Sequence, residues 1–199
     1  VGAVSCPKCN ASVERPAGDL GPGVVVGDFL IEKNISKGGM GEVFQARQIS
    51  LDRSVALKVL QKEYTDDREY VDSLFREAKA AARISHPNIV QAYAVGQDGD
   101  IFYFAMELVR GDTVKNILRK EGRLEASRAA KIIRDIANAL DAAWREQRLV
   151  HQDIKPDNIL IYKNGDFVIT DFGISKQLRA TLRKTANSLN SAGSISYMG

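Results

Sequence analysis

The segment 151–158, with the sequence HQDIKPDN, gathers several side chains that could do chemistry. Asp153 carries a carboxylate that can accept a proton from a hydroxyl group. Lys155 lies on the same side of an extended loop and can reach a phosphate that carries developing negative charge. Asn158 offers an amide oxygen, which is a suitable hard ligand for Mg²⁺. The segment therefore favours chemistry on a phosphate.

Asp171 offers a second oxygen ligand, since it follows the apolar run FVIT and precedes Phe172 and Gly173. Alone, the sequence Asp-Phe-Gly is also the pattern of an ordinary turn. Behind the first segment, however, it would add a ligand to the same cation site. His151 has no partner at a metal-ligand spacing, so we expect it to pack and form hydrogen bonds beneath the loop.

Three glycines, Gly38, Gly39 and Gly41, lie in the connection SKGGMGEVF between two β-type runs. Without a Cβ atom, this backbone can approach a ligand and point N–H groups at phosphate oxygens. A flexible hairpin tip is the more common reason for such a pattern when it stands alone.

Lys58 stands inside the apolar strand VALKVL, where a buried ammonium costs free energy unless it meets an anion. Glu77 lies beside the apolar stripe of the next helix, so we expect it to face the sheet and to pair with Lys58. Such a pair could position a phosphate. The alternatives are a lysine that snorkels at a sheet edge and a glutamate on a solvated helix face.

Hydrophobic periodicity predicts the elements that position these residues. Five β-type runs predict an antiparallel sheet: FLIEKNI, EVFQARQ, SVALKVL, QAYAVG and IFYFAMEL. Apolar spacings of three and four predict a helix between about Asp66 and His86, and a second from about Glu125 to Gln147. NILIY and FVIT predict two short strands, and the chain after Asp171 is typical of a long polar loop. The apolar stripe of the second helix comprises Ala129, Ile132, Ile133, Ile136, Leu140 and Trp144.

Composition limits the class of protein. The 199 residues carry a net charge of +3, which is too weak to argue for a nucleic-acid partner. The sequence has no apolar run of about 18 residues and does not open on a signal peptide. Because Val1 is not methionine and Gly199 follows SISYMG directly, we expect a piece of a longer protein.

Together, the motifs resemble those of eukaryotic-type protein kinases of the bacterial serine/threonine class. From about residue 29 to 199, the family's order and spacing are kept by Gly41, Lys58, Glu77, Asp153, Asn158 and Asp171. The resemblance implies an α+β, bilobal fold. Residues 28–107 would form a complete kinase N-lobe of five antiparallel strands and one helix, and residues 108–199 a helical C-lobe truncated after the activation segment. Residues 1–27 would be a cysteine knuckle and linker.

The resemblance also implies a reaction, in which the γ-phosphate of ATP passes to Ser or Thr hydroxyls of protein substrates. Asp153 would be the base and Lys155 the γ-phosphate contact, so that Asp153, Lys155 and Asn158 form the catalytic group. Asn158 and Asp171 would be the Mg²⁺ ligands. Lys58, paired with Glu77, would hold the α- and β-phosphates.

For the nucleotide, the resemblance implies a pocket between the lobes. Val43 and Ala56 would pack on opposite sides of adenine, Met106 would guard the back pocket, and the backbones of Glu107 and Val109 would hydrogen-bond the base. The complete set of expected ATP-binding residues is Ile35, Gly38, Gly39, Gly41, Val43, Ala56, Lys58, Glu77, Met106, Glu107, Val109 and Asp171.

The sequence departs from the family pattern in three places. Ser36 replaces the first glycine of the loop, so we expect a stiffer turn and weaker nucleotide affinity. Gln152 replaces the arginine before the catalytic aspartate and cannot pair with a phosphate on the activation loop, so loop phosphorylation should regulate weakly. The chain also ends before the Pro-Glu that normally follows YMG, so we expect this chain alone not to catalyse transfer.

Cys6 and Cys9 resemble one knuckle of a zinc ribbon, which would add Zn²⁺ to the expected ATP and Mg²⁺. Structural zinc needs four ligands, and no further cysteine follows. Either a second knuckle lies upstream, which we favour, or the two cysteines are free. They lie too close together for a disulfide framework, and a reducing compartment is the simpler interpretation.

Two other functions compete with the kinase. A pseudokinase that acts as a nucleotide-gated binding module would not need the intact Lys58, Asp153, Asn158 and Asp171. A small-molecule phosphotransferase would not need Lys155, HPNIV and YMG, which favour protein substrates. We expect protein partners with Ser or Thr acceptors, no nucleic acid, and a cytoplasmic kinase domain, with membrane anchoring outside the chain left open.

Overall fold

The computed structural model describes residues 4–5, 12–13, 20–38, 41–60, 68–162 and 164–172. The predictions for Cys6, Cys9, Gly39, Gly173 and the polar segment 174–199 concern residues outside the described ranges. Near the N-terminus, strand β1 (Val4–Ser5) pairs with β2 (Ser12–Val13) in an antiparallel ribbon. None of the described helices is both long and apolar enough to cross a membrane.

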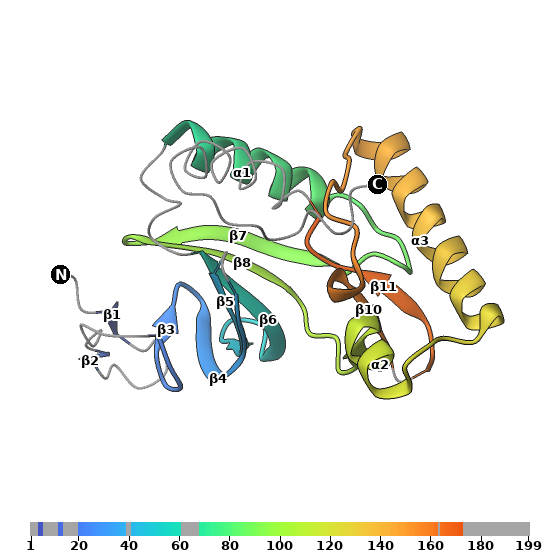
Figure 1. The fold of residues 1–199 in the computed structure, drawn as a ribbon. Helices are drawn as coiled ribbons and strands as arrows, with labels where there is room; N and C mark the ends of the chain where they lie inside the picture. The colour runs from blue at the N-terminus through green and yellow to red at the C-terminus, as the bar shows by residue number, and fades with distance from the viewer. Residues whose placement is uncertain are drawn as a thin grey trace, which may run out of the picture.

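The first lobe is built on a six-stranded antiparallel sheet (Figure 1). In spatial order its strands are β3 (Val25–Val26), β4 (Phe29–Gly38), β5 (Gly41–Gln48), β6 (Arg53–Leu60), β8 (Ile101–Glu107) and β7 (Ala92–Asp98). The predicted count of five strands is one short, because a two-residue run such as β3 shows no alternation. Val26 is fully buried, so the sheet begins inside the segment that the sequence assigns to a linker.

Strand β6 is a central strand whose two faces enter different hydrophobic clusters. Leu57 and Val59 belong to one cluster, and Ala56 and Leu60 belong to the other. Because side chains alternate along a strand, Lys58 lies on the face of Ala56 and Leu60. The alternative of a lysine at a sheet edge is therefore wrong, since β5 and β8 flank this strand.

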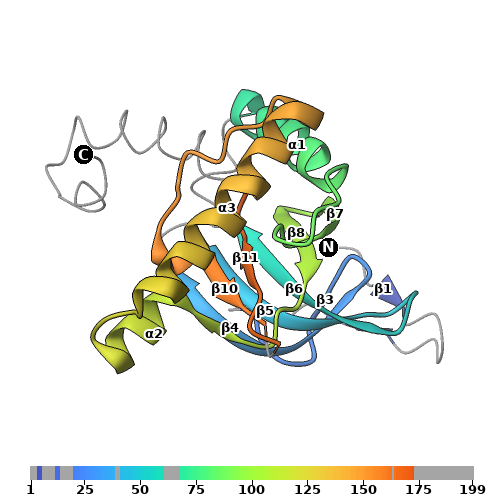
Figure 2. The same cartoon turned by 90° about the vertical axis from the view of Figure 1, so that its right-hand side faces the viewer.

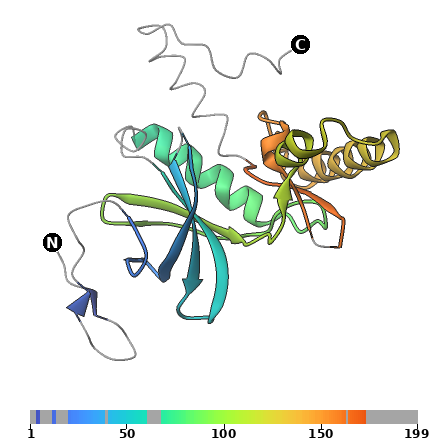
Figure 3. The same ribbon diagram turned by 60° about the horizontal axis from the view of Figure 1, so that its bottom comes forward.

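Helix α1 (Arg68–Ala82) covers that face of the sheet and packs on β7 (Figure 3). Val71 and Ala78 join the same cluster as Ala56, and Phe75 packs against it. The helix thus carries Glu77 on the side of the sheet to which Lys58 belongs. One carboxylate oxygen of Glu77, Oε2, is buried from solvent.

Among the described residues, the second lobe contains two α-helices and a three-stranded sheet (Figure 2). Its elements are β9 (Asp112–Thr113), α2 (Val114–Glu121), α3 (Ala126–Gln147), a 3₁₀ turn at Pro156–Asn158, β10 (Ile159–Ile161) and β11 (Phe167–Ile169). Thr113 begins α2 by accepting a hydrogen bond at Oγ1 from the Asn116 N–H, at 3.1 Å. The sequence does not predict β9 or α2, because two turns of helix contain too few apolar residues to show a period.

Helix α3 follows its predicted bounds but not all of its predicted stripe. Ile132 and Ile136 are buried against β11, as predicted. Ile133 is 70% exposed and Trp144 is 48% exposed, so the described residues leave these two members of the apolar stripe largely uncovered. Successive residues of a helix are rotated by about 100°, which turns Ile133 away from the face of Ile132.

The hairpin of β10 and β11 separates two hydrophobic clusters. Leu160 and Val168 are opposite each other and face the cluster that contains Ala56 and Met106. The flanking pairs of the same hairpin face the cluster around α3: Ile159 with Ile169, and Ile161 with Phe167. These two three-residue strands therefore connect the cluster that contains Ala56 and Met106 with the core of the second lobe.

Candidate active site

The predicted catalytic residues meet in the loop before β10. Asp153 is buried, and its Oδ2 lies 2.9 Å from Lys155 Nζ. Asn158 donates from Nδ2 to the same carboxylate oxygen at 3.1 Å and to the Asp153 carbonyl at 2.8 Å. The 3₁₀ turn places Asn158 for both bonds. Because its amide nitrogen is used in this way, its Oδ1 is the atom that could ligate a cation.

His151 holds this loop against the strand that leads to Asp171. The imidazole is fully buried; its Nδ1 accepts from the Asp153 N–H at 3.2 Å, and its Nε2 lies 2.8 Å from the Thr170 carbonyl. A neutral ring with its proton on Nε2 satisfies both contacts. Burial lowers the pKa of His151, which favours this neutral form. The predicted packing role beneath the loop is confirmed.

Thr170 joins the catalytic loop to the end of β11. Its N–H donates to the Asn158 carbonyl at 2.9 Å, while its carbonyl receives the His151 contact. Its Oγ1 donates to Met106 Sδ at 3.5 Å. Nothing in the sequence singles out this residue, because a threonine that ends a strand is common. The next residue, Asp171, has a positive φ of 65°, a backbone conformation that residues other than glycine rarely adopt.

Lys58 reaches across to the second lobe. Its Nζ donates to Asp171 Oδ1 at 2.8 Å, and the lysine is only 5% exposed. The anion that a buried ammonium requires is thus supplied by Asp171. The pair of Lys58 with Glu77 stays a prediction.

The glycine connection has a backbone requirement of its own. At Gly41 φ is +148°, and an added Cβ would lie 2.0 Å from the Val59 carbonyl oxygen. At Gly38 the nearest atom to such a Cβ is 3.9 Å away. The close pairing of β5 with β6 is therefore sufficient to explain why residue 41 is a glycine, without any role in phosphate binding. Ile35 lies at an irregularity between the pairs of Asn34 and Ser36, and it is 47% exposed.

Apolar residues of both lobes share one hydrophobic cluster. Val43, Ala56, Met106 and Val109, all expected around adenine, contribute to one hydrophobic cluster with Leu160 of β10. The sequence does not single out Leu160, because the run NILIY shows no difference between its two faces. Only the pairing of β10 with β11 turns Leu160 toward this cluster.

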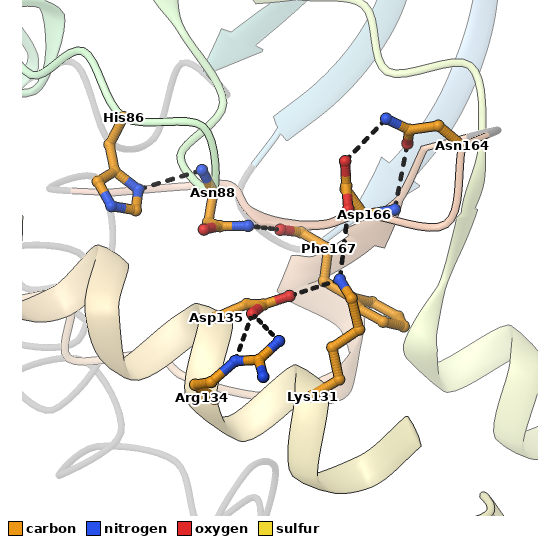
Figure 4. Close-up of polar contacts among 8 residues, drawn as sticks. All are labelled: His86, Asn88, Lys131, Arg134, Asp135, Asn164, Asp166 and Phe167. Carbon is orange, nitrogen blue, oxygen red and sulfur yellow. Dashed lines mark hydrogen bonds and ion pairs between the residues drawn. The ribbon is translucent and has the colours of Figure 1, made fainter. Parts of the chain in front are cut away.

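The connection from α1 to β7 is bonded directly to β11 (Figure 4). Asn88 donates from Nδ2 to the Phe167 carbonyl at 2.7 Å, and its own carbonyl accepts from the Ile169 N–H at 2.9 Å. The Val90 N–H donates to the Ile169 carbonyl at 3.0 Å. His86 accepts the Asn88 N–H at Nδ1 and closes the turn. Each lobe thus holds the strand that precedes Asp171.

On the side of α3, Lys131 holds the same strand (Figure 4). Its Nζ lies 2.7 Å from Asp135 and 3.3 Å from Asp166, and 5.3 Å from the centre of the Phe167 ring. Hydrogen bonds, from Lys131 first and then Arg134, lower the pKa of the buried Asp135 carboxylate. The charge of Asp135 is therefore compensated beneath β11.

Comparison with known proteins agrees with this geometry. Residues 29–199 match the family of the protein kinase domain, and the chain belongs to that family. The serine/threonine-protein kinase PrkC of Bacillus subtilis (strain 168) is 40% identical over 174 residues, which cover 87% of this chain and 26% of PrkC. PknA of Mycobacterium tuberculosis is 37% identical over 159 residues, which cover 77% of this chain and 37% of PknA.

Among solved structures, the crystal structure of the PknI kinase domain of M. tuberculosis is similar to this chain. The TM-score is 0.74 with 27% sequence identity, over 79% of this chain and 63% of that one. The expected bilobal kinase fold is confirmed. Since the chain spans about a quarter of PrkC, the activity, substrates and partners of the intact protein are proposals.

Proposed function

We propose that the intact protein is a serine/threonine protein kinase that transfers the γ-phosphate of ATP to Ser or Thr hydroxyls of proteins. One observation supports the proposal: Asp153, Lys155 and Asn158 lie in mutual contact, and the Asn158 carbonyl accepts the N–H of Thr170, the residue before Asp171. The proposed base, the proposed phosphate contact and the proposed cation ligands thus belong to neighbouring, hydrogen-bonded segments.

The donor atoms fit Mg²⁺. Asn158 and Asp171 offer hard amide and carboxylate oxygens, and the Asn158 amide is fixed through its nitrogen. Bound Mg²⁺ would neutralise negative charge on the ATP phosphates. Lys58 is proposed to exchange its contact with Asp171 for the α- and β-phosphates, with Glu77 as its partner.

The nucleotide is proposed to lie on the apolar cluster between the lobes. Val43 and Ala56 come from neighbouring strands of the first-lobe sheet and share one cluster, so in place of the expected opposite sides we assign both to one face of adenine and Leu160 of β10 to the other. Ile35 would close the edge. Met106 would border the back of the pocket. The Glu107 N–H is bonded to the Gln91 carbonyl at 2.9 Å, so we assign its carbonyl to adenine, together with the backbone of Val109. Gly38, Gly39 and Gly41 would cover the phosphates.

In the proposed reaction Asp153 accepts the proton of the incoming hydroxyl. Lys155, whose Nζ lies 2.9 Å from that carboxylate, would turn toward the transferred phosphate. Burial keeps bulk water from the carboxylate. Asn158 fixes its direction through Oδ2.

The experiment is phosphate transfer to a generic basic protein by the intact protein and by its Asp153→Asn variant. We expect transfer to fall by at least ~100-fold while ATP affinity changes by less than ~3-fold. Asp157→Asn is the matched control, because Asp157 lies in the same loop but contacts Lys115 of α2. Retention of most turnover by Asp153→Asn would refute the assignment, and nucleotide binding without transfer in the wild type would favour the pseudokinase.

The remaining expectations stay proposals. Cys6 and Cys9 are proposed to hold half of a zinc site, with further ligands elsewhere in the intact protein. Metal analysis should then find about one zinc per chain, lost in Cys6→Ser. A zinc-free intact protein would contradict this. Protein substrates and a cytoplasmic location of the kinase domain are inferred from the family alone.

A further inference from the structure

Glu107, the last residue of β8, is held by two separate parts of the protein. Its N–H donates to the Gln91 carbonyl at 2.9 Å. Its carboxylate Oε1 accepts from the Tyr162 hydroxyl at 2.6 Å, although the two residues are 55 positions apart. The residue whose backbone is assigned to adenine therefore has a side chain fixed by the second lobe.

Tyr162 is well placed to act as a rigid support. It directly follows β10, and its N–H donates to the Asp166 carbonyl while its own carbonyl accepts from the Gly165 N–H, both at 2.9 Å. Its ring packs against the cluster that contains Leu160. The backbone bonds of the hairpin and the packing of the ring thus fix the position of the Tyr162 hydroxyl.

The same hairpin carries the proposed cation ligands. Asn158 immediately precedes β10, and Asp171 follows β11 by two residues. The contact between Tyr162 and Glu107 therefore connects the proposed cation site with residues 107–109, whose backbone is proposed to bind adenine and which are here called the adenine segment. In this segment the chain passes from the first lobe to the second.

The surroundings of the hydrogen bond between Tyr162 and Glu107 limit its strength. Tyr162 also lines an open recess of about 560 Å³ with Leu108 and Arg110, so water reaches one side of the ring. Burial, and then the hydrogen bond to Glu107, raise the pKa of Tyr162, so the phenol remains a donor at any working pH. If the loss of this hydrogen bond to a half-buried carboxylate misplaces Glu107, the affinity for the nucleotide should fall by about 3- to 10-fold.

We propose that Tyr162 is a positioning residue for the nucleotide: its hydroxyl holds Glu107 so that the adenine segment keeps a fixed place relative to the cation ligands. This inference rests on the proposed kinase function. It predicts that removal of the hydroxyl weakens nucleotide binding without slowing the transfer step.

The test compares the wild type with Tyr162→Phe in the intact protein, which removes one oxygen atom and keeps the ring. We expect KM for ATP and the Kd of adenosine, measured by calorimetry, to rise about 3- to 10-fold, with kcat within about twofold. Tyr103→Phe is the control, because this half-buried tyrosine lies in the first lobe beside Gly96 and away from Glu107. It should change neither constant.

A double-mutant cycle separates positioning from general damage. Glu107→Ala should also weaken adenosine binding, and the double variant with Tyr162→Phe should lose no more than the larger single loss. Glu107→Gln keeps an acceptor and should lie between wild type and Glu107→Ala. Additive losses, or a fall in kcat alone, would overturn the inference.

The two proposals fail in different ways. If the wild type binds neither adenosine nor ATP, the kinase function itself is refuted. If the wild type binds adenosine and Tyr162→Phe binds it equally well, only the role of Tyr162 is refuted. A matched melting temperature of the two proteins verifies that the comparison is between folded chains.

Discussion

Lys58 and Asp171 are 113 residues apart in the sequence, and their Nζ and Oδ1 atoms are 2.8 Å apart in the fold. Lys58 comes from a central strand of the first lobe, and Asp171 comes from the end of β11 in the second. The contact therefore joins the lobes through two charged groups that the proposed reaction uses: the phosphate-binding lysine and a cation ligand.

Asp171→Asn should weaken both stability and Mg·ATP binding. The substitution keeps shape but leaves the Lys58 ammonium without this anion, at an expected loss of about 1–3 kcal/mol in the free energy of unfolding. Denaturant unfolding and ATP titrations with and without Mg²⁺ measure the two effects. In the Lys58→Met/Asp171→Asn double variant, stability should partly return while binding does not; equal stability of Asp171→Asn and wild type would contradict the prediction.

Gly41 and Gly38 form a matched pair for a test of backbone space. Gly41→Ala should destabilise the protein by at least ~2 kcal/mol, because the new methyl group would lie 2.0 Å from the Val59 carbonyl. Gly38→Ala should change stability by less than ~0.5 kcal/mol, since the nearest atom among the described residues lies 3.9 Å from the new methyl group. Thermal unfolding of both variants decides; a benign Gly41→Ala would mean that β5 can move away from β6.

The buried His151 should make stability depend on pH. Burial lowers its pKa below the ordinary value of 6.5, so the unfolded chain takes up the proton first as pH falls. The contribution is fully present above pH 6.5 and is lost as the pH falls toward the lowered pKa of the folded state. His151→Gln should therefore flatten the fall in melting temperature between about pH 7.5 and 5. An unchanged slope in His151→Gln would contradict the prediction.

Asn88→Ala should loosen the attachment of β11. It removes the 2.7 Å hydrogen bond to the Phe167 carbonyl, at an expected cost of about 1–2 kcal/mol. Hydrogen exchange should become faster at the amides of Val90 and Ile169. Asn164→Ala, in the exposed turn of the hairpin, should leave both rates unchanged. Unaltered exchange in Asn88→Ala would show that the backbone bonds alone hold the strand.

Much of the fold and site is visible in the sequence because single residues break a local pattern. A lysine in an apolar run, such as Lys58, requires an anion whichever way the chain folds. Leu160 breaks no pattern, since both faces of its strand are apolar and only the pairing with β11 distinguishes them. Ile133 obeys the helical period closely enough to be included, yet its exposure depends on which elements surround α3.

Tyr162 shows a further limit of sequence reasoning. Its role depends on a partner 55 residues away, and neither residue is unusual in its own segment. A contact of this kind is fixed by how strands are ordered in space, which local periodicity does not specify.

In the hairpin of β10 and β11, side chains at alternate positions contact different hydrophobic clusters. Leu160 and Val168 face the cluster that contains Ala56 and Met106, while Ile159 and Ile161 face the cluster around α3. A one-residue slip would exchange the two sets and move Asp171 relative to Asn158. An insertion within β10 should thus damage folding and phosphate transfer together, whereas an insertion in the turn before Asp166 would preserve the parity. The register of the hairpin therefore tolerates added residues at its tip but not along its strands.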